Sequence, residues 1–317
     1  MSDTLSALRA LASSSVVFPL VAESYVNVRG EDRAKLLQNL CTNNILSLAE
    51  GEGCEAFLTN IQGKVLAHVE VHALADRLLL HSVPGQAEKI IAHLDRYVIR
   101  EDVTFEDVSE TLVALLFAGP DAFSVLRTLG VLDMPSKRLS IGDACIAGIE
   151  VAVSRVDWTG EDGIRIDCPA SQCEKMLQLL QEAGAELGSD KAFDVARIAH
   201  GTPRYGRDIN EENLAQEVNR DALAIDFRKG CYLGQETIAR IDALGHVNQK
   251  LCRLRIDSNQ EPPAGSELLA ADAPAGRITS AAFSPISESV VALGYVRRGH
   301  NKSGETLRSS FGEVHVT

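Results

Sequence analysis

Residues 228–241 read RKGCYLGQETIARI and form the most unusual grouping in the sequence. Gly230 and Gly234 flank Cys231, Tyr232 and Leu233, so the backbone is free to bend on both sides of the cysteine. The residues QETIARI that follow favour a helix, with an acidic side chain near its start. We therefore expect a turn that presents the Cys231 side chain and then opens a helix whose free N–H groups can meet an anion.

The residues alone leave two roles open for this stretch. Lys229 and the helix N-terminus would both favour the thiolate of Cys231 and hence its reactivity. Alternatively, Cys231 packs as a small apolar residue. In the same way, Tyr232 either stacks on a flat heterocycle or fills core space.

The segments that precede this stretch alternate between strand and helix patterns. Residues 24–30 (SYVNVRG) predict a strand that leads into a helix within residues 31–45, and residues 55–74 predict a hairpin. In that hairpin, alternation places Val65, Ala67, Val69 and Val71 on one face. One helix among pairs of strands is typical of a split β-α-β arrangement, so residues 50–135 are predicted to form a ferredoxin-like subdomain.

The pattern changes near residue 248, where short extended runs are broken by Gly, Pro and Ser and no helical stripe remains. This predicts a separate C-terminal β-barrel domain over residues 248–317. Residues 1–247 would then form the main region, built of two subdomains.

Composition narrows the classes of function. The net charge of −13 over 317 residues opposes binding to nucleic acid, although ten Lys and Arg outnumber eight Asp and Glu between Arg197 and Arg255. The seven cysteines show no C-x-x-C spacing, so neither a disulfide framework nor a metal site is expected. No apolar run is long enough to span a membrane, and the first residues do not resemble a targeting segment, so a cytoplasmic location is expected.

KGCYLGQE, residues 229–236, resembles the signature of the YgfZ family of folate-binding proteins. These are relatives of the aminomethyltransferase of the glycine cleavage system and of mitochondrial iron-sulfur assembly factors. Residues 28–45, 57–71 and 276–298 resemble other segments of the same superfamily. The resemblance implies an aminomethyltransferase-like α+β fold, with mixed antiparallel α+β subdomains around a central cleft for tetrahydrofolate or a one-carbon derivative, and a C-terminal β-barrel.

The YgfZ resemblance also implies a role in iron-sulfur cluster assembly or repair, with Cys231 as the reactive residue. The implied partners are iron-sulfur assembly proteins or client iron-sulfur enzymes, and one such client would link the protein to tRNA modification. Direct binding to nucleic acid or to a membrane is not expected. One alternative is a folate-dependent aminomethyltransferase or demethylase, and another is a non-catalytic folate-binding scaffold.

Two departures from the transferase relatives concern expected carboxylates. His68 stands where those relatives often carry Asp, and Arg165 stands where they carry Glu. A carboxylate can accept N–H bonds from the edge of a pterin, whereas an arginine has only donors. These departures argue against transfer chemistry, although His68 could act as a base near neutral pH.

The predicted folate-binding residues are Glu217, Asn219, Arg228, Lys229, Gly230, Tyr232, Gly234, Gln235, Glu236 and Arg240. By the resemblance, the first two would face the cleft. The three cations would meet the glutamate tail of folate, or would form surface salt bridges without function. The Gln-Glu pair would either contribute to binding or cap the turn.

Overall fold

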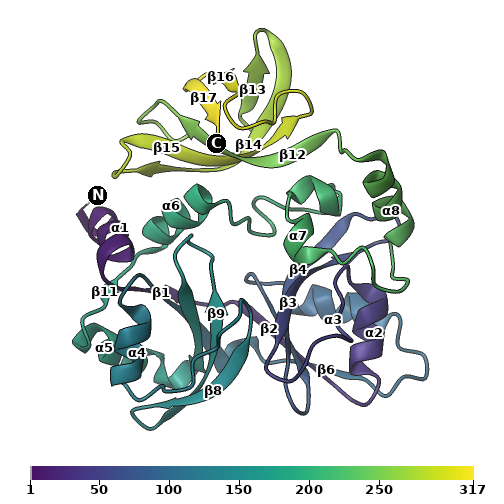
Figure 1. Ribbon diagram of the computed structural model, residues 1–317, viewed down its shortest axis with the longest axis vertical. Coiled ribbons are helices and arrows are strands. Elements are labelled where there is room, and N and C mark those ends of the chain that lie inside the picture. The colour runs from purple at the N-terminus through teal and green to yellow at the C-terminus, as the bar shows by residue number, and fades with distance from the viewer. Residues whose placement is uncertain (1) are drawn as a thin grey trace.

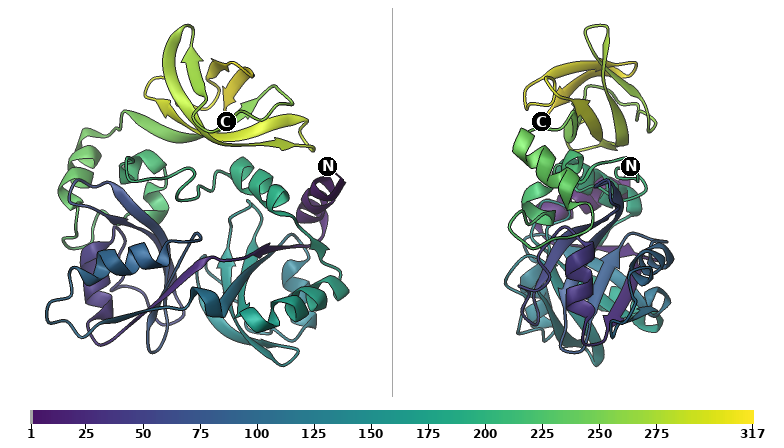
Figure 2. Two further views of the ribbon diagram at one scale, coloured as in Figure 1. Left: turned by 180° about the vertical axis from the view of Figure 1, so that it is seen from behind. Right: turned by 90° about the vertical axis from the view of Figure 1, so that its right-hand side faces the viewer.

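The computed structural model describes residues 2–317 and has three parts arranged around a centre (Figure 1). Two α/β lobes lie side by side, and a β-barrel at the C-terminal end lies against both of them. The side view in Figure 2 shows that the assembly is flat, with the barrel stacked on the lobes.

The first lobe is a five-stranded antiparallel sheet in the order β3-β4-β5-β2-β6. Its strands are β2 (Ser24–Arg29), β3 (Gly53–Thr59), β4 (Val65–Ala73), β5 (Leu78–Ser82) and β6 (Thr104–Asp107). Helices α2 (Arg33–Leu40) and α3 (Ala87–Asp95) pack on one face, over a core that contains Ala67, Val69 and Val71. The predicted strand, helix and hairpin of this lobe are confirmed. The prediction that Val65 shares a face with Ala67, Val69 and Val71 is wrong, because the pairing of β3 and β4 shifts register there and Val65 joins another core with Phe57.

The second lobe is a six-stranded sheet in the order β11-β1-β7-β10-β9-β8. Its strands are β1 (Val16–Leu20), β7 (Leu112–Ala118), β8 (Ile141–Ile146), β9 (Ile149–Val156), β10 (Gly163–Pro169) and β11 (Glu186–Leu187). Its core includes side chains of α4 (Ala122–Thr128) and α5 (Cys173–Glu182). Helices α1 (Ser2–Ser13) and α6 (Asp190–His200) share a second core with this lobe and the barrel.

The segment of residues 50–135 contributes strands to both sheets. Residues 50–135 supply β3 to β6 of one sheet and also β7 of the other, because β7 pairs with β1 and β10. The limits of the subdomains, and the division between residues 247 and 248, stay predictions as units of folding.

The C-terminal part is a closed barrel in the order β12-β15-β14-β13-β16-β17. Its strands are β12 (Gln249–Ile256), β13 (Glu267–Ala270), β14 (Ala273–Ser284), β15 (Ser289–Arg297), β16 (Thr306–Ser309) and β17 (Gly312–Val316). A separate apolar core fills it, with Leu254, Val290 and Val314 among its members. The predicted fold class, an α+β aminomethyltransferase-like fold with a C-terminal barrel, is confirmed.

The chain reaches the barrel through short helical elements that lie beside the first lobe. These elements are η3 (Ala215–Val218), α7 (Asp221–Ala224) and α8 (Gln235–Leu244). The helix predicted from QETIARI is therefore confirmed. Within residues 2–317, no helix is long and apolar enough to cross a bilayer.

A polar row crosses the face of the first sheet that lies opposite α2 and α3. Alternation along β4 turns His68 and Glu70 away from the apolar core. The strand register then places Glu55 opposite Glu70, Glu70 opposite His81, and His81 opposite Tyr25. The joint between the two sheets is therefore lined with ionisable groups, and these groups set the chemistry of the site.

Candidate functional site

A cleft opens at the joint between the two lobes. The lining comes from β3, β4, β5, the turn after β9, α6, and the loops before β2 and α7. Trp158 and Phe193 supply its aromatic surface, and its ionisable lining comprises Glu23, Glu55, His68, Glu70, His81, Arg197, Arg204 and Arg220. Concave sites with apolar walls and a few fixed polar groups are typical of small-molecule binding.

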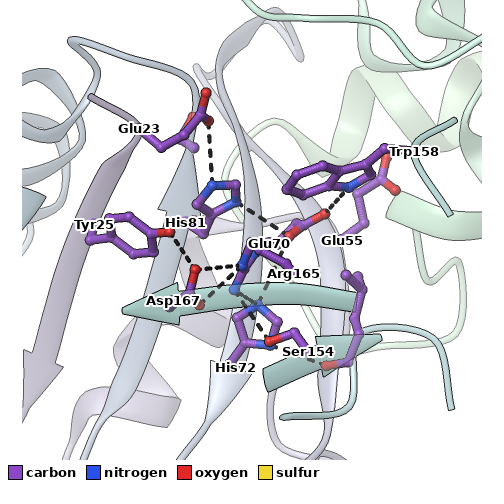
Figure 3. Close-up of polar contacts among 12 residues, drawn as sticks. Glu23, Tyr25, Glu55, Glu70, His72, His81, Ser154, Trp158, Arg165 and Asp167 are labelled. Atoms are coloured by element: carbon purple, nitrogen blue, oxygen red, sulfur yellow. Dashed lines mark hydrogen bonds and ion pairs between the residues drawn. The ribbon is translucent and has the colours of Figure 1, made fainter. Parts of the chain in front are cut away.

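Arg165 is the centre of the network beneath the cleft (Figure 3). It projects from β10, is 0% exposed, and donates from Nη1 to Glu70 at 2.6 Å and from Nε to Asp167 at 3.0 Å. Asp167 also accepts a hydrogen bond from the hydroxyl of Tyr25 at 2.5 Å. The arginine that replaces the expected carboxylate therefore joins the two sheets and has no surface of its own in the cleft.

Glu70 links this network to the cleft wall. It accepts from the indole Nε1 of Trp158 at 2.7 Å, which fixes the ring at the edge of the cleft. Burial works to raise the pKa of Glu70, but the hydrogen bond from His81 and the charge of Arg165 outweigh it and hold the pKa far below its usual range. Glu70 is therefore an ionised acceptor whose two oxygens are both occupied.

The two buried histidines of the network have opposite charge preferences. Burial and the nearby Arg165 lower the pKa of His72 to about 3, so this ring is neutral. Burial and Arg165 also act to lower the pKa of His81, but Glu23 and Glu70 outweigh them and raise it. His81 has a ring nitrogen 3.3 Å from each of these carboxylates and stacks on Trp158 with centroids 5.5 Å apart.

A second ion cluster lies at the neighbouring part of the cleft. Glu55 is 2% exposed and is held by both guanidinium groups of Arg138 and Arg220 and by His68 Nε2 at 2.8 Å. Burial works to raise the pKa of Glu55, but Arg220 and His68 outweigh it and hold the pKa well below its usual range. Because buried ion pairs carry a large desolvation cost, two such clusters at one cleft point to a functional requirement.

The RKGCYLGQE segment lies apart from the cleft lining. Cys231 is exposed, in the turn between α7 and α8, whereas Tyr232 is buried in a core with Phe57 and Ile238. The prediction that the turn presents the Cys231 side chain agrees with this placement. No residue of 228–241 lines the cleft, so a role of Cys231 as the reactive residue stays a prediction.

Of the two glycines in the segment, Gly234 packs closely against the β3–β4 turn. Gly234 has φ +85°, and a Cβ atom there would lie 2.4 Å from the carbonyl oxygen of Asn60. Next to it, Leu233 donates its N–H to Asn39 O at 2.9 Å and accepts from Thr59 Oγ1 at 2.6 Å. Gly230 is exposed and has open space around it.

Lys229 is a buried cation at the end of helix α2. Its Nζ donates to the carbonyl oxygens of Gln38 at 2.6 Å, Cys41 at 2.7 Å and Asn43 at 2.7 Å, and lies over the ring of Tyr232. Cations are favourable at helix C-termini, where carbonyl groups lack partners within the helix. All three ammonium donors are thus directed at the backbone, which leaves none for a folate tail.

The other predicted binding residues also lie outside the cleft lining. Glu217 is buried and caps η3 by accepting from Leu214 N at 3.1 Å, and burial raises its pKa. Asn219 donates to the barrel residue Leu251 at 3.2 Å. The exposed members of the set are Arg228, Glu236 and Arg240, and Gln235 is half-buried. As ligand contacts, these residues stay predictions.

The cleft residues that sequence reasoning missed come from segments far apart in the chain and include Glu23, Glu55, Glu70, His81, Trp158, Phe193, Arg197, Arg204 and Arg220. One signal for them existed in β4, where HVEVH alternates ionisable and apolar residues in a strand flanked by two others. Within residues 2–317, no group of three or more His, Cys, Asp or Glu side chains is arranged to hold a metal ion.

The fold and the cleft define an α+β protein with three parts around a central site. Residues 5–229 match the family described as GCVT N-terminal domain, and residues 249–316 match the glycine cleavage T-protein C-terminal barrel domain. The chain therefore belongs to the GCVT family.

Known proteins support this family membership. The chain is 27% identical to a candidate chloroplastic transferase of Arabidopsis thaliana, over 95% of this chain and 69% of that protein. It is 29% identical to an aminomethyltransferase of Thermus thermophilus, over 86% of this chain and 76% of that protein. The crystal structure of the glycine cleavage system aminomethyltransferase T from Bartonella henselae has the same fold, with a TM-score of 0.88, 20% identity, and coverage of 99% of this chain and 88% of that one.

Proposed function

We propose that this protein binds tetrahydrofolate, or a one-carbon derivative of it, in the central cleft and transfers a one-carbon unit there. The observation that carries the proposal is the cleft itself, which has aromatic walls and fixed ionic groups in a chain that is similar to named aminomethyltransferases. Trp158 is held by Glu70 and lines the cleft, where aromatic contact with a pterin ring is proposed. Arg204 and Arg220 are the lining cations with partial exposure, and they replace Arg228, Lys229 and Arg240 as the proposed contacts of the glutamate tail.

The expected carboxylates that the sequence lacks at positions 68 and 165 do not leave the cleft without acids. Glu55 and Glu70 line it from β3 and β4, beside His68 and above Arg165. The absence of acids at positions 68 and 165 therefore does not argue against transfer chemistry, because carboxylates from neighbouring strands occupy the same region.

Folate binding is testable through Trp158, which is the single tryptophan of the chain and lines the cleft. Tetrahydrofolate should quench its fluorescence, and calorimetry should give the same dissociation constant. The matched variant Trp158→Phe should lose the optical signal but keep a measurable heat of binding. If neither signal changes up to millimolar tetrahydrofolate, the proposal is wrong.

Transfer is tested by supplying tetrahydrofolate and an aminomethylated carrier protein and following the methylene form of the folate. Turnover that requires both substrates supports the aminomethyltransferase reading. Tetrahydrofolate that raises the melting temperature without any turnover would instead favour the scaffold alternative.

A second candidate function is the YgfZ-type role in iron-sulfur cluster assembly or repair. The specific observation in its favour is the exposed Cys231 thiol within KGCYLGQE, outside the cleft and open to a protein partner. Such a role would bring iron-sulfur assembly proteins or client enzymes as partners. In cells lacking the protein, a Cys231→Ala variant should fail to restore the activity of iron-sulfur enzymes, whereas Cys145→Ala, at another exposed cysteine, should restore it. Full restoration by Cys231→Ala would remove the proposed role of the thiol.

A further inference from the structure

Three histidines extend from β4 and β5 toward the joint between the sheets, and they differ in what their ring nitrogens contact. His72 uses both nitrogens, one 3.1 Å from the carbonyl oxygen of Leu139 and the other 3.0 Å from Arg165 Nη2. His81 is placed with one nitrogen toward each of two carboxylates, those of Glu23 and Glu70. His72 therefore has no nitrogen left for a ligand. The Nε2 atom of His81 is buried beside Glu23 without a hydrogen-bond partner among residues 2–317, and its side chain is only 5% exposed.

His68 is different because only one of its nitrogens is engaged. Its Nε2 lies 2.8 Å from Glu55 Oε1, and its Nδ1 has no hydrogen-bond partner among residues 2–317. The side chain lines the cleft and is 15% exposed. His68 therefore has one nitrogen tied to the protein and a second nitrogen without a protein partner, in a side chain that lines the cleft.

Glu55 fixes which nitrogen carries the proton. It is an ionised carboxylate and can only accept hydrogen bonds, so the ring must place its N–H on Nε2. Arg138 and Arg220 each donate to Glu55, at 2.8 Å and 2.6 Å, and prevent the carboxylate from turning away. Phe57 packs beside the imidazole with ring centroids 5.1 Å apart. A base oriented by a carboxylate that is itself held in place is the usual form of a general acid–base pair.

We infer that His68 is the acid–base residue of the cleft, acting through Nδ1, and that Glu55 is its positioning residue. This inference rests on the proposed one-carbon transfer. In that reaction a folate nitrogen uses its lone pair to bond to the carbon of the aminomethyl group, while the bond from this carbon to its leaving group breaks with its electron pair. The attacking nitrogen gives its proton to Nδ1 of His68, and His68 returns that proton to the leaving group. No electrons are gained or lost in the step.

The charged groups around His68 are compatible with this cycle. Glu55 on β3 faces Nε2, and Arg138 and Arg220 reach the ring only through that carboxylate. Glu70, two residues along β4, is occupied by Arg165 and Trp158. Both carboxylates nearest to His68 on β3 and β4 are thus held by other protein groups.

The first test replaces the base. His68→Gln should lower the rate of transfer by about 10²- to 10⁴-fold, while the tetrahydrofolate dissociation constant from Trp158 fluorescence stays within about threefold of wild type. His246→Gln is the matched control, because His246 is exposed beyond α8 and remote from the cleft lining. Transfer by His68→Gln at the wild-type rate would overturn the inference.

The second test observes the ring directly by ¹⁵N nuclear magnetic resonance of the wild-type protein. The His68 signals should show the proton on Nε2, and the Nδ1 shift should change when tetrahydrofolate is added. Glu55→Ala should mix the two tautomers, and Glu55→Gln, which keeps an acceptor oxygen, should restore the Nε2–H form. A Trp158 response to folate with unchanged His68 shifts would overturn the role of His68 alone, whereas no response from either group would overturn the proposed function itself.

Discussion

Replacing Lys229 by methionine decides whether the lysine of KGCYLGQE is structural or binds a ligand. Methionine keeps much of the stem volume but removes the ammonium that donates to three carbonyls at the end of α2. Leaving one buried acceptor unpaired costs about 1–3 kcal/mol, and the helix-end charge contributes a further 0.3–1 kcal/mol or so. The buried ammonium group itself carries a desolvation cost in the folded state. Because methionine does not carry this cost, part of the loss in stability is offset. We expect a net loss of about 2–4 kcal/mol in the free energy of unfolding.

Urea unfolding followed by circular dichroism measures this loss, and Trp158 fluorescence measures the tetrahydrofolate affinity of the same samples. The matched control is Lys302→Met, at an exposed position in the barrel, which should change stability by less than about 0.5 kcal/mol. The Lys229→Met protein should bind folate as tightly as wild type. A stability loss under about 1 kcal/mol together with a tenfold weaker affinity would refute the helix-capping argument and restore the tail-binding prediction.

Three further outcomes follow from the buried clusters and the close packing of the glycine turn. Arg165→Met should lower the free energy of unfolding by about 3–5 kcal/mol in urea, because Glu70 and Asp167 would remain buried without their cation; a loss below 1 kcal/mol would contradict this. Gly234→Ala should reduce thermal stability, because its backbone is left-handed and the added Cβ would lie 2.4 Å from Asn60 O; an unchanged melting temperature would show that the turn can relax. The pKa of Glu70 is lowered on folding, so its contribution is complete above the ordinary glutamate pKa of about 4.3 and is lost as the pH falls below it. Unfolding measured from pH 6 to pH 3 should therefore show a shallower loss for Glu70→Gln than for wild type.

Local patterns were enough to predict most elements of the fold. The alternation Ala67, Val69 and Val71 predicted β4 because those side chains pack under α2 and α3. The turn-rich C-terminal pattern predicted the barrel. Helix α1 was missed, since the first residues were considered only as a targeting segment. The assignment of β7 to the second sheet was missed as well. This strand is near β6 in sequence but pairs with β1, which comes before it, and with β10, which comes long after it.

The site was less predictable because its members are assembled by tertiary contacts. Sequence reasoning assigned importance to residues 229–236, where the chemistry is contiguous, but Lys229 and Gly234 lie against α2 and the β3–β4 turn. From the sequence, Arg165 was interpreted as a missing carboxylate. The sequence did not indicate that Glu70, far away along the chain, accepts a hydrogen bond from Arg165 at 2.6 Å. A pair of charges that neutralise each other across two sheets leaves no periodic signal in either strand.

The joint centred on Arg165 also gives the protein a particular response to temperature. The cost of removing ions from water falls on warming, whereas apolar contacts lose strength on cooling. The ionic contact between the two lobes should therefore lose little stability at high temperature. The apolar cores inside each lobe are the parts that cooling should weaken most.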